Sequence, residues 1–548
     1  MKRCPECRRD YFDETLLYCL DDGSALLEGP ASADEKATAI LSGLPGEAPT
    51  KQLTEPLGGS LSKRNSIVAG AAVLLLLLAG AGYWYYASRN TKQISSIAVL
   101  PLQNRGGDTD TEYLSDGLAE SLIYRLSQMP NLKVSPTSSV FRYKGQDIDA
   151  EKVGKELGVD AVMSGRMIQR GDNLTISISL VDVANNKVIW GEQYDRKIAD
   201  LLATQREIAG QIVNSLAIKI SGDEKAINKR YTENNEAYRL YLKGRYFWNK
   251  REAESTRKAI EYFNEAIEKD RGFALAYAGL ADAYVVPASR MPPHESMPKA
   301  KAAALRALEI DDTLAEAHTS LARVLQVYEW NWAESEKQYL RAIELNPRYA
   351  VAHQWYGGFL ERTGRIDQAI SRRNLALELD PLSAITTFEL GQSFLFAKEY
   401  DKAREQFQKA LELDPNLPAA YQYIPLVYVQ KGLFDEAIAN IQSAPANAAL
   451  GETGVPGYVY AMAGRTEDAR SMIEQLKGLR GNRYYISPVG IASVYAGLGE
   501  IDETILWLEK GYEERSFQMQ LLKIDPRWDK IRSDPRFQDL VRRMGLPQ

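Results

Sequence analysis

Three cysteines near the start of the chain have the spacing of a metal site. Cys4 and Cys7 form a C-x2-C pair, Cys19 follows, and these are the only cysteines among 548 residues. Tetrahedral zinc takes four thiolate, imidazole or carboxylate ligands, and C-x2-C supplies two of them from one turn. We predict a structural zinc site formed by Cys4, Cys7, Cys19 and Asp22. Asp21 is an alternative fourth ligand, and free surface thiols are the alternative to metal binding.

The stretch CPEC followed by CLDDG resembles the half zinc ribbons that open many bacterial signalling membrane proteins. This resemblance implies a zinc-ribbon-like module over residues 1–28 with a structural or adhesive role. Basic residues beside the first two cysteines suggest nucleic-acid binding as another interpretation, but the later residues of the stretch are acidic. The chain has a net charge of −6, so a nucleic-acid partner is not favoured.

Side chains for catalysis are otherwise sparse. The sequence has three histidines, His294, His318 and His353, and His294 has no second histidine at the zincin spacing. It contains no G-x-x-x-x-G-K-[ST], no G-x-S-x-G and no kinase set of H-R-D with D-F-G. We therefore predict a non-catalytic protein without a small-molecule substrate.

An apolar segment separates the cysteines from the rest of the chain. Residues 67–86, IVAGAAVLLLLLAGAGYWYY, carry no charge, and as a helix they would span about 30 Å, the thickness of a bilayer core. The segment ends in Tyr and Trp, which are favoured at membrane interfaces. We predict a transmembrane helix over residues 66–87, with a buried core helix as the alternative. Residues 29–65 are rich in Ala, Gly, Pro, Ser and Thr, which predicts a flexible linker.

The distribution of cysteines predicts the orientation of this segment. All three precede it, and a thiol cluster that holds metal must stay reduced, as in the cytosol. Basic residues flank both ends, so charge alone does not decide the orientation. We predict a single-pass protein of the bacterial inner membrane, with a cytoplasmic N-terminus and extracytoplasmic later regions. A homodimer stays open, because signalling through one helix would need two copies.

Residues 95–222 read as an α+β domain. An apolar strand over 96–102 is followed by a helix over 113–129, a second strand region over 132–141 and a short helix ending at Gly158. Three further strands are joined by compact turns, which predicts an antiparallel meander. In the central strand, Leu174, Ile176, Ile178 and Leu180 alternate with polar residues. A closing helix is predicted over about 198–220.

The same region resembles a known family. The segments SIAVLPL, YLSDGLAESLI, FRYKG, GKELGVDAVMSGRM and WGEQYDR are similar, in this order, to the TolB-like amino-terminal domain of bacterial envelope and signalling proteins. The resemblance implies a protein-binding domain that commonly precedes tetratricopeptide repeats (TPRs). It supplies no catalytic residue.

The second half of the chain is periodic. ELNP, ELDP and ELDP place Pro347, Pro381 and Pro415 at steps of 34 residues, the period of the TPR. Gly364, Lys398 and Gly432 recur with the same period and mark the turn within each repeat. We predict about eight repeats over residues 232–517, followed by a capping segment over 518–548.

Stacked helix pairs form a superhelix with a concave groove, and such grooves bind extended peptides or helices. The residues predicted to face the groove are Gln354, Glu361, Phe388, Gln392, Leu395, Gln422 and Val429. Ordinary packing between repeats, or plain exposure to solvent, is the alternative for each of them. This lining lacks the Lys, Asn and Arg set that clamps a terminal carboxylate, so binding of a chaperone tail is not favoured.

These observations predict a multidomain protein: a small zinc-ribbon-like N-terminus, one transmembrane helix, an α+β TolB-like domain and an all-α TPR superhelix. The predicted function is that of a membrane-anchored scaffold or sensor whose groove binds a protein partner. The alternative is a structural assembly factor for an envelope complex with a vestigial ribbon.

Overall fold

The computed structural model describes three two-residue strands near the start of the chain and most of the chain from Ile94 onward. The described ranges are 94–106, 111–129, 131–146, 149–216, 229–250, 252–286, 291–445, 454–480 and 485–546. The chain divides into two units, Met1–Asn90 and Thr91–Gln548. In the first unit β1 (Lys2–Arg3), β2 (Asp10–Tyr11) and β3 (Leu27–Glu28) form an antiparallel sheet in the order β2-β1-β3.

The predicted localisation is corrected by the structure. In the part of the chain that is described, no helix is both long and apolar enough to cross a bilayer. The longest of the described helices, α10 (Pro293–Ile310), has 18 residues but carries Lys, Arg and Glu side chains along its length. The segment 66–87 lies outside the described residues. The prediction of a single-pass inner-membrane protein with extracytoplasmic domains is therefore withdrawn.

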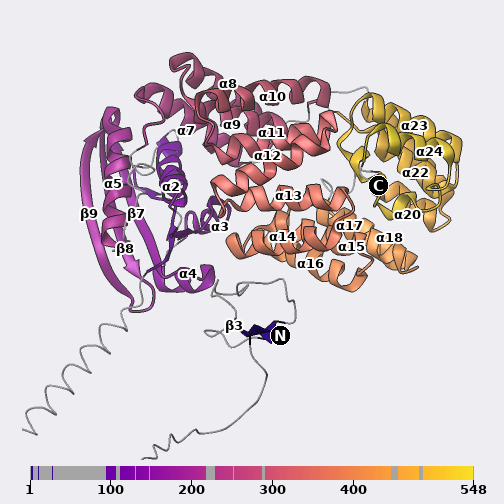
Figure 1. Cartoon of the computed structure of the whole chain (residues 1–548), viewed down its shortest axis with the longest axis horizontal. Coiled ribbons are helices and arrows are strands. Elements are labelled where there is room, and N and C mark those ends of the chain that lie inside the picture. Colours follow the sequence, from indigo (N-terminus) through magenta and orange to yellow (C-terminus); the bar gives the residue numbers. More distant parts are fainter. Residues whose placement is uncertain are drawn as a thin grey trace, which may run out of the picture. The chain divides into compact units, whose positions relative to one another are not determined.

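A mixed sheet forms the start of the second unit (Figure 1). Its order is β6-β4-β7-β8-β9, and β5 pairs with β7. The strands are β4 (Ser96–Val99), β5 (Gln103–Asn104), β6 (Lys133–Val134), β7 (Ala161–Arg170), β8 (Asn173–Asp182) and β9 (Lys187–Lys197). The helices and turns between and after them are α2 (Glu112–Ser127), α3 (Thr137–Val140), η2 (Phe141–Tyr143), α4 (Ala150–Leu157), η3 (Ile198–Asp200) and α5 (Leu201–Ser215).

The predicted meander is confirmed, because β7, β8 and β9 pair antiparallel along their lengths. Leu174, Ile176, Ile178 and Leu180 are all buried, as their alternation predicts. The strand predicted over 132–141 is wrong beyond Val134. Pro136 has no backbone N–H to donate to a sheet, and α3 begins directly after it.

Helix pairs follow the sheet (Figure 1). Within the described residues there are eight of them, and the predicted bounds of the repeat array stay a prediction. The first helices are α7 (Asn235–Asn249), α9 (Ala274–Val285), α11 (Ala315–Val324), α13 (Ala350–Arg362), α15 (Ala384–Phe396), α17 (Pro418–Gln430), α20 (Val455–Met462) and α22 (Pro488–Leu498). Their partners are α8 (Ala253–Lys269), α10, α12 (Trp332–Leu345), α14 (Ile366–Leu379), α16 (Tyr400–Leu413), α18 (Phe434–Ser443), α21 (Thr466–Arg480) and α23 (Ile501–Glu513).

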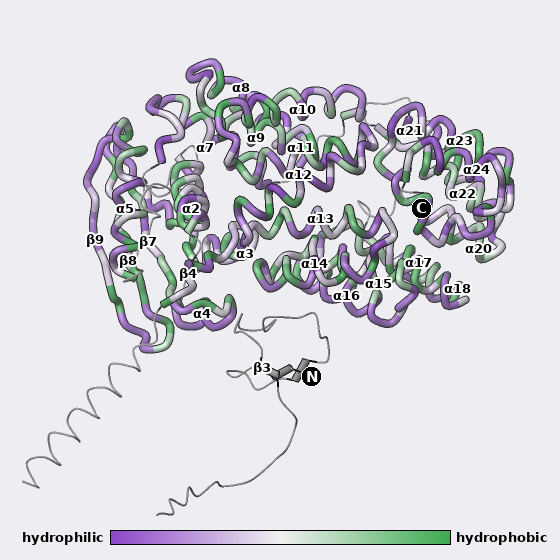
Figure 2. Tube along the Cα trace, in the orientation of Figure 1, coloured by the Kyte–Doolittle hydropathy of each residue, from purple (hydrophilic) through white to green (hydrophobic). Residues whose placement is uncertain are grey.

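Small residues let the two helices of a repeat approach closely. A Cβ atom at Gly391 would lie 2.6 Å from the ring of Phe407, and one at Gly244 would lie 2.6 Å from the ring of Phe263. Hydrophilic and hydrophobic residues alternate along these helices, as the tube in Figure 2 shows. Each helix therefore buries one apolar face against its neighbours.

The α+β domain and the first repeats share one apolar core. This cluster contains Ile97 and Leu118 of the sheet domain together with Leu242 of α7 and Ala276 of α9. The predicted boundaries of the two domains stay predictions, because residues on both sides of the predicted boundary belong to this one cluster. The chain ends in η6 (Phe517–Leu521), η7 (Pro526–Trp528) and α24 (Pro535–Arg543).

Candidate functional site

The seven residues predicted to line a groove lie on three consecutive first helices. Gln354 and Glu361 belong to α13, Phe388, Gln392 and Leu395 to α15, and Gln422 and Val429 to α17. The structure thus brings them together, but none is more than 9% exposed. In this conformation they do not form an open surface for a partner.

Packing between repeats accounts for several of these positions. Glu361 forms a buried ion pair with Arg373, and the Ser393 hydroxyl donates to its Oε2 atom at 2.7 Å. The Phe388 ring packs against Phe407 at 5.5 Å and against Tyr423 at 5.2 Å between ring centroids. This matches the alternative interpretation of the sequence, in which such residues hold the repeats together.

The C-terminal segment lies against the same helices. Leu521 of η6 belongs to one apolar cluster with Phe388, Leu395 and Val429. The buried Gln326 side chain donates from Nε2 to Oε1 of Gln520 at 2.8 Å. The segment predicted to cap the last repeat therefore also packs against helices of earlier repeats.

The segment is held by a repeated motif, Asp-Pro-Arg followed by an aromatic residue. In Asp525-Pro526-Arg527-Trp528 the carboxylate accepts from the backbone N–H of Arg527 at 2.9 Å and from its guanidinium at 2.6 Å. The same arrangement recurs from Asp534 to Phe537. This repetition is visible in the sequence and could have indicated that the segment is ordered and folded.

The α+β domain is joined to the first repeat by polar contacts. Glu120 of α2 accepts from Nε of Arg245 at 2.7 Å and from Nδ2 of Asn249 at 2.9 Å, both on α7. Tyr246 of α7 donates its hydroxyl to Glu112, the first residue of α2, at 3.1 Å. A change at the start of α2 is thereby linked directly to α7.

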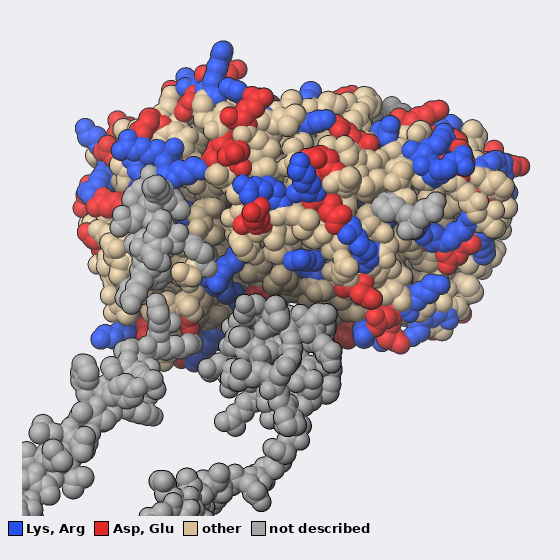
Figure 3. All heavy atoms as spheres, in the orientation of Figure 1, with Lys and Arg blue, Asp and Glu red and all other residues tan. Residues whose placement is uncertain are grey.

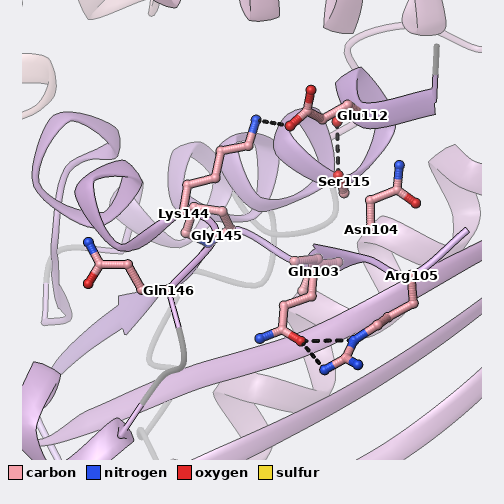
Figure 4. Close-up of a pocket in the computed structure, with 10 residues that line it drawn as sticks. Gln103, Asn104, Arg105, Glu112, Ser115, Lys144, Gly145 and Gln146 are labelled. Atoms are coloured by element: carbon pink, nitrogen blue, oxygen red, sulfur yellow. Dashed lines mark hydrogen bonds and ion pairs between the residues drawn. The ribbon is translucent and has the colours of Figure 1, made fainter. Parts of the chain in front are cut away.

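A crevice opens beside this junction (Figure 4). It has a volume of about 410 Å³, and its lining includes Asn104, Arg105, Glu112, Ser115 and Lys144. In Figure 4, Lys144, Glu112 and Ser115 lie on one side, and Gln103 and Arg105 lie on the other.

Electrostatics around the crevice centre on Lys144. Its ammonium group lies 2.6 Å from Glu112 and 2.6 Å from Asp116. The hydrogen bond from Lys144 lowers the pKa of Glu112. Burial raises the pKa of Asp116 to about 6, against the opposing effect of Lys144.

Lysines lie over aromatic rings on the adjoining face of α7 and α8. Lys243 is 5.0 Å from the ring centroid of Tyr113 and 5.3 Å from that of Tyr262. Lys250 lies 4.6 Å from the Tyr246 ring, and Lys258 lies 5.4 Å from the Phe247 ring. We call these residues the cation–aromatic surface: Tyr113, Lys243, Tyr246, Phe247, Lys250, Lys258 and Tyr262. On the face drawn in Figure 3, basic and acidic side chains are interspersed.

The predicted zinc ligands Cys4, Cys7, Cys19 and Asp22 lie outside the described residues. Among the residues that are described, no group of three or more His, Cys, Asp and Glu side chains could hold a metal ion. The zinc site stays a prediction.

Two family models match parts of the chain. Residues 92–210 match the second domain of HilA/YgeH-like transcriptional regulators, and residues 384–417 match the tetratricopeptide repeat. The TPR array predicted for the second half is thus supported, whereas the TolB-like resemblance stays a prediction.

Individual relatives match the same regions. Over 187 residues the chain is 35% identical to putative adenylate cyclase 3 of Rhizobium meliloti, covering 34% of this chain and 32% of the relative. Over 296 residues it is 24% identical to the transcriptional regulator HilA of Salmonella typhimurium, covering 53% of this chain and 51% of the relative. The chain spans about a third of the first relative's length and about half of the second's.

The repeats are also similar to a pilus protein. Over 136 residues the chain is 33% identical to the type IV pilus assembly protein PilF of Pseudomonas aeruginosa, covering 24% of this chain and 54% of the relative. A solved structure of P. aeruginosa PilF, 25% identical, covers 39% of this chain and 94% of its own with a TM-score of 0.30.

Proposed function

We propose that the chain is a non-catalytic, regulatory scaffold that binds a protein partner through its repeat region. The observation that carries this proposal is the cation–aromatic surface on the first repeat. Lys250 and Lys258 are exposed, and their ammonium groups lie over the rings of Tyr246 and Phe247. Glu112 and Glu254 are the carboxylates that interact with these two lysines. Such a surface favours an acidic peptide segment that also carries apolar side chains.

The inner face of the repeats is a weaker candidate. All seven predicted groove residues are buried, and the chain's own C-terminal segment packs beside them. A partner there would have to displace η6. Met519 within η6 and Leu522 directly after it are both fully buried. Docking on the cation–aromatic surface, where Lys250 and Lys258 are exposed, requires no such opening.

The names of the relatives support a regulatory role. The model that matches residues 92–210 describes the second domain of transcriptional regulators, and the Rhizobium meliloti relative is named as a putative adenylate cyclase. The zinc-ribbon-like module, with zinc on Cys4, Cys7, Cys19 and Asp22, is proposed as a structural element. We expect the purified full chain to contain zinc and the Cys19→Ser variant to have lost it, as measured by metal analysis.

The second candidate function is assembly of a multi-protein complex. The similarity of the repeats to the pilus assembly protein PilF favours it. A scaffold for assembly would bind several proteins at once, whereas a regulatory scaffold would bind one acidic segment at the cation–aromatic surface.

Photo-crosslinking from Tyr262 tests the favoured function. We would place a benzoylphenylalanine at Tyr262, and at the exposed Leu340 on α12 as a matched control. One crosslinked protein is expected from Tyr262, joined through an acidic peptide and lost in the double variant Lys250→Glu, Lys258→Glu. Equal capture from Leu340, or a crosslinked peptide without acidic residues, would contradict the proposal. Several different proteins captured from Tyr262 would favour the assembly factor.

A further inference from the structure

The crevice beside Lys144 lies next to two successive connections of the sheet, which lead to opposite sides of strand β4. Strand β4 is central, with parallel neighbours β6 on one side and β7 on the other. After β4 the chain enters α2 and returns in β6. After β6 it passes through α3, η2 and α4 and crosses to β7.

The helices that make these connections cover opposite faces of the sheet. Gly154 of α4 lies against Val162 of β7. Helix α5 contacts α2, and its Gln211 accepts a hydrogen bond from Tyr194 of β9. Tyr194 lies opposite Ile176 of β8, which in turn lies opposite Met167 of β7, so α5 packs on the face of Met167. Val162 and Met167 are an odd number of residues apart, so their side chains point to opposite faces.

This arrangement creates a crevice at the carboxyl ends of the strands. In open sheets with parallel strands, ligands bind at the point where successive connections turn to opposite faces. The lining of the crevice comes from the two connections concerned: residues 101–105 follow β4, Glu112 and Ser115 begin α2, and residues 144–146 follow β6. The cavity is therefore produced by the topology of the sheet rather than by a chance gap between side chains.

The polar groups of the crevice indicate the kind of ligand. Lys144 uses two of its three N–H donors for Glu112 and Asp116. The exposed Arg105 guanidinium donates from Nε and one Nη to the Gln103 side-chain oxygen, at 3.2 and 2.9 Å. The Ser115 hydroxyl donates to the backbone carbonyl of Glu112, so its oxygen can still accept. Two carboxylates already offset the charge of Lys144, whereas the Arg105 guanidinium bonds only the neutral Gln103 oxygen. Arg105, with the remaining donor of Lys144, therefore suits an anionic group.

We propose that this crevice binds a small molecule through a phosphate or carboxylate group, held between Lys144 and Arg105. The remaining N–H of Lys144 and the outer edge of the Arg105 guanidinium would contact the anion. Glu112 also accepts from Tyr246 of α7, so an anion that draws Lys144 away from Glu112 alters a contact to the first repeat. The α+β domain would then report the ligand to the repeat array. This is a binding role, separate from the prediction that the protein has no small-molecule substrate.

Thermal unfolding of the full chain tests this proposal. We would titrate sodium phosphate and sodium succinate from 0.1 to 20 mM at constant ionic strength, and follow the unfolding midpoint. A saturable rise of about 1–2 °C with at least one anion is expected. The rise should be lost in Lys144→Met, weakened at least five-fold in apparent affinity in Arg105→Gln, and kept in Lys152→Met, which changes an exposed lysine on α4.

The outcomes separate the possible ligands. A rise with phosphate alone indicates a phosphate ester, and a rise with succinate alone indicates a carboxylate. Arg105→Gln keeps the test decisive if Lys144→Met fails to fold, because Arg105 contacts only the exposed edge of the crevice. The absence of a saturable rise with either anion, or an equal rise in the wild type and Arg105→Gln, would overturn the proposal. None of these results depends on a protein partner.

Discussion

Ser139 and Asp380 lie 241 residues apart in the sequence, and the Ser139 hydroxyl donates to the Asp380 carboxylate at 2.5 Å. Ser138 donates to the other carboxylate oxygen, also at 2.5 Å. Asp380 ends α14 of the fourth repeat, whereas both serines belong to α3 of the α+β domain. The α+β domain is thus fixed to the first repeat through α2 and to the fourth repeat through α3.

Replacement of Asp380 should weaken this second attachment. Asp380→Ala leaves the buried Ser139 hydroxyl without its acceptor and removes the contact with the exposed Ser138, so we expect a loss of about 2 kcal/mol in the free energy of unfolding. Asp414→Ala is the matched control, because Asp414 ends α16 at the equivalent position, where its carboxylate accepts a local hydrogen bond from the Asn416 N–H. Urea unfolding of both variants measures the difference. Equal losses would mean that the contact with α3 contributes nothing.

Lys398 occupies the turn position at which the neighbouring repeats have glycine, and its side chain disfavours the backbone conformation required there. It has φ of +63° at the turn where Gly364 and Gly432 stand in the neighbouring repeats, with φ of +84° and +73°. The left-handed conformation costs a residue with a Cβ atom about 1–2 kcal/mol, part of which glycine returns as chain entropy. Lys398→Gly should therefore raise the unfolding free energy by about 0.5–1 kcal/mol. Lys409→Gly, at an exposed position inside α16, should lower it by about 1 kcal/mol.

Glu361 distinguishes a packing role from a binding role on the inner face. Glu361→Gln removes the closer of the two carboxylates beside the buried Arg373 guanidinium and leaves only Glu389, at 4.0 Å, so we expect a loss of about 3 kcal/mol in stability. Glu344→Gln removes an exposed pair with Arg341 and should change stability by no more than about 0.5 kcal/mol. Chemical unfolding provides both values. A Glu361→Gln variant as stable as Glu344→Gln would reopen the groove interpretation.

The sequence predicts the local elements of this fold better than it predicts what packs against them. The alternation of β8 and the period of 34 residues are set by short-range geometry, and the structure has both elements. The burial of Phe388 and Gln392 depends on neighbouring repeats and on η6, which is more than a hundred residues away. Periodicity places a side chain on the inner face of a helix, but it does not show what covers that face.

The crevice illustrates the same limit at the candidate ligand site. Each of its segments is short and unremarkable in the sequence, and FRYKG contributed to the family resemblance without any ligand being inferred from Lys144. Only the crossing of the chain from β6 to β7 brings Lys144 beside Glu112 and across the crevice from Arg105. Such a site follows from topology, which a single sequence does not specify.

Glu316, in the first turn of α11, should make stability depend on pH. Burial raises its pKa to about 7 from 4.5, and Asp282 adds to this effect. Between these two values the folded protein keeps the proton while the unfolded chain loses it. The unfolding free energy therefore falls as pH rises from about 4.5 to about 7 and is then constant with respect to this group.

Glu316→Gln cannot ionise, so its stability should change less across this range than that of the wild type. Asp116 contributes with the same sign, but its pKa of about 6 places most of its effect at lower pH. Thermal unfolding of both proteins between pH 5 and pH 8 measures the difference, which isolates Glu316 because Asp116 is present in each. The variant should gain stability relative to the wild type as pH rises to 8. Parallel curves would show that Glu316 is ionised in the folded protein throughout, and that the charge of Arg245 outweighs the effect of burial.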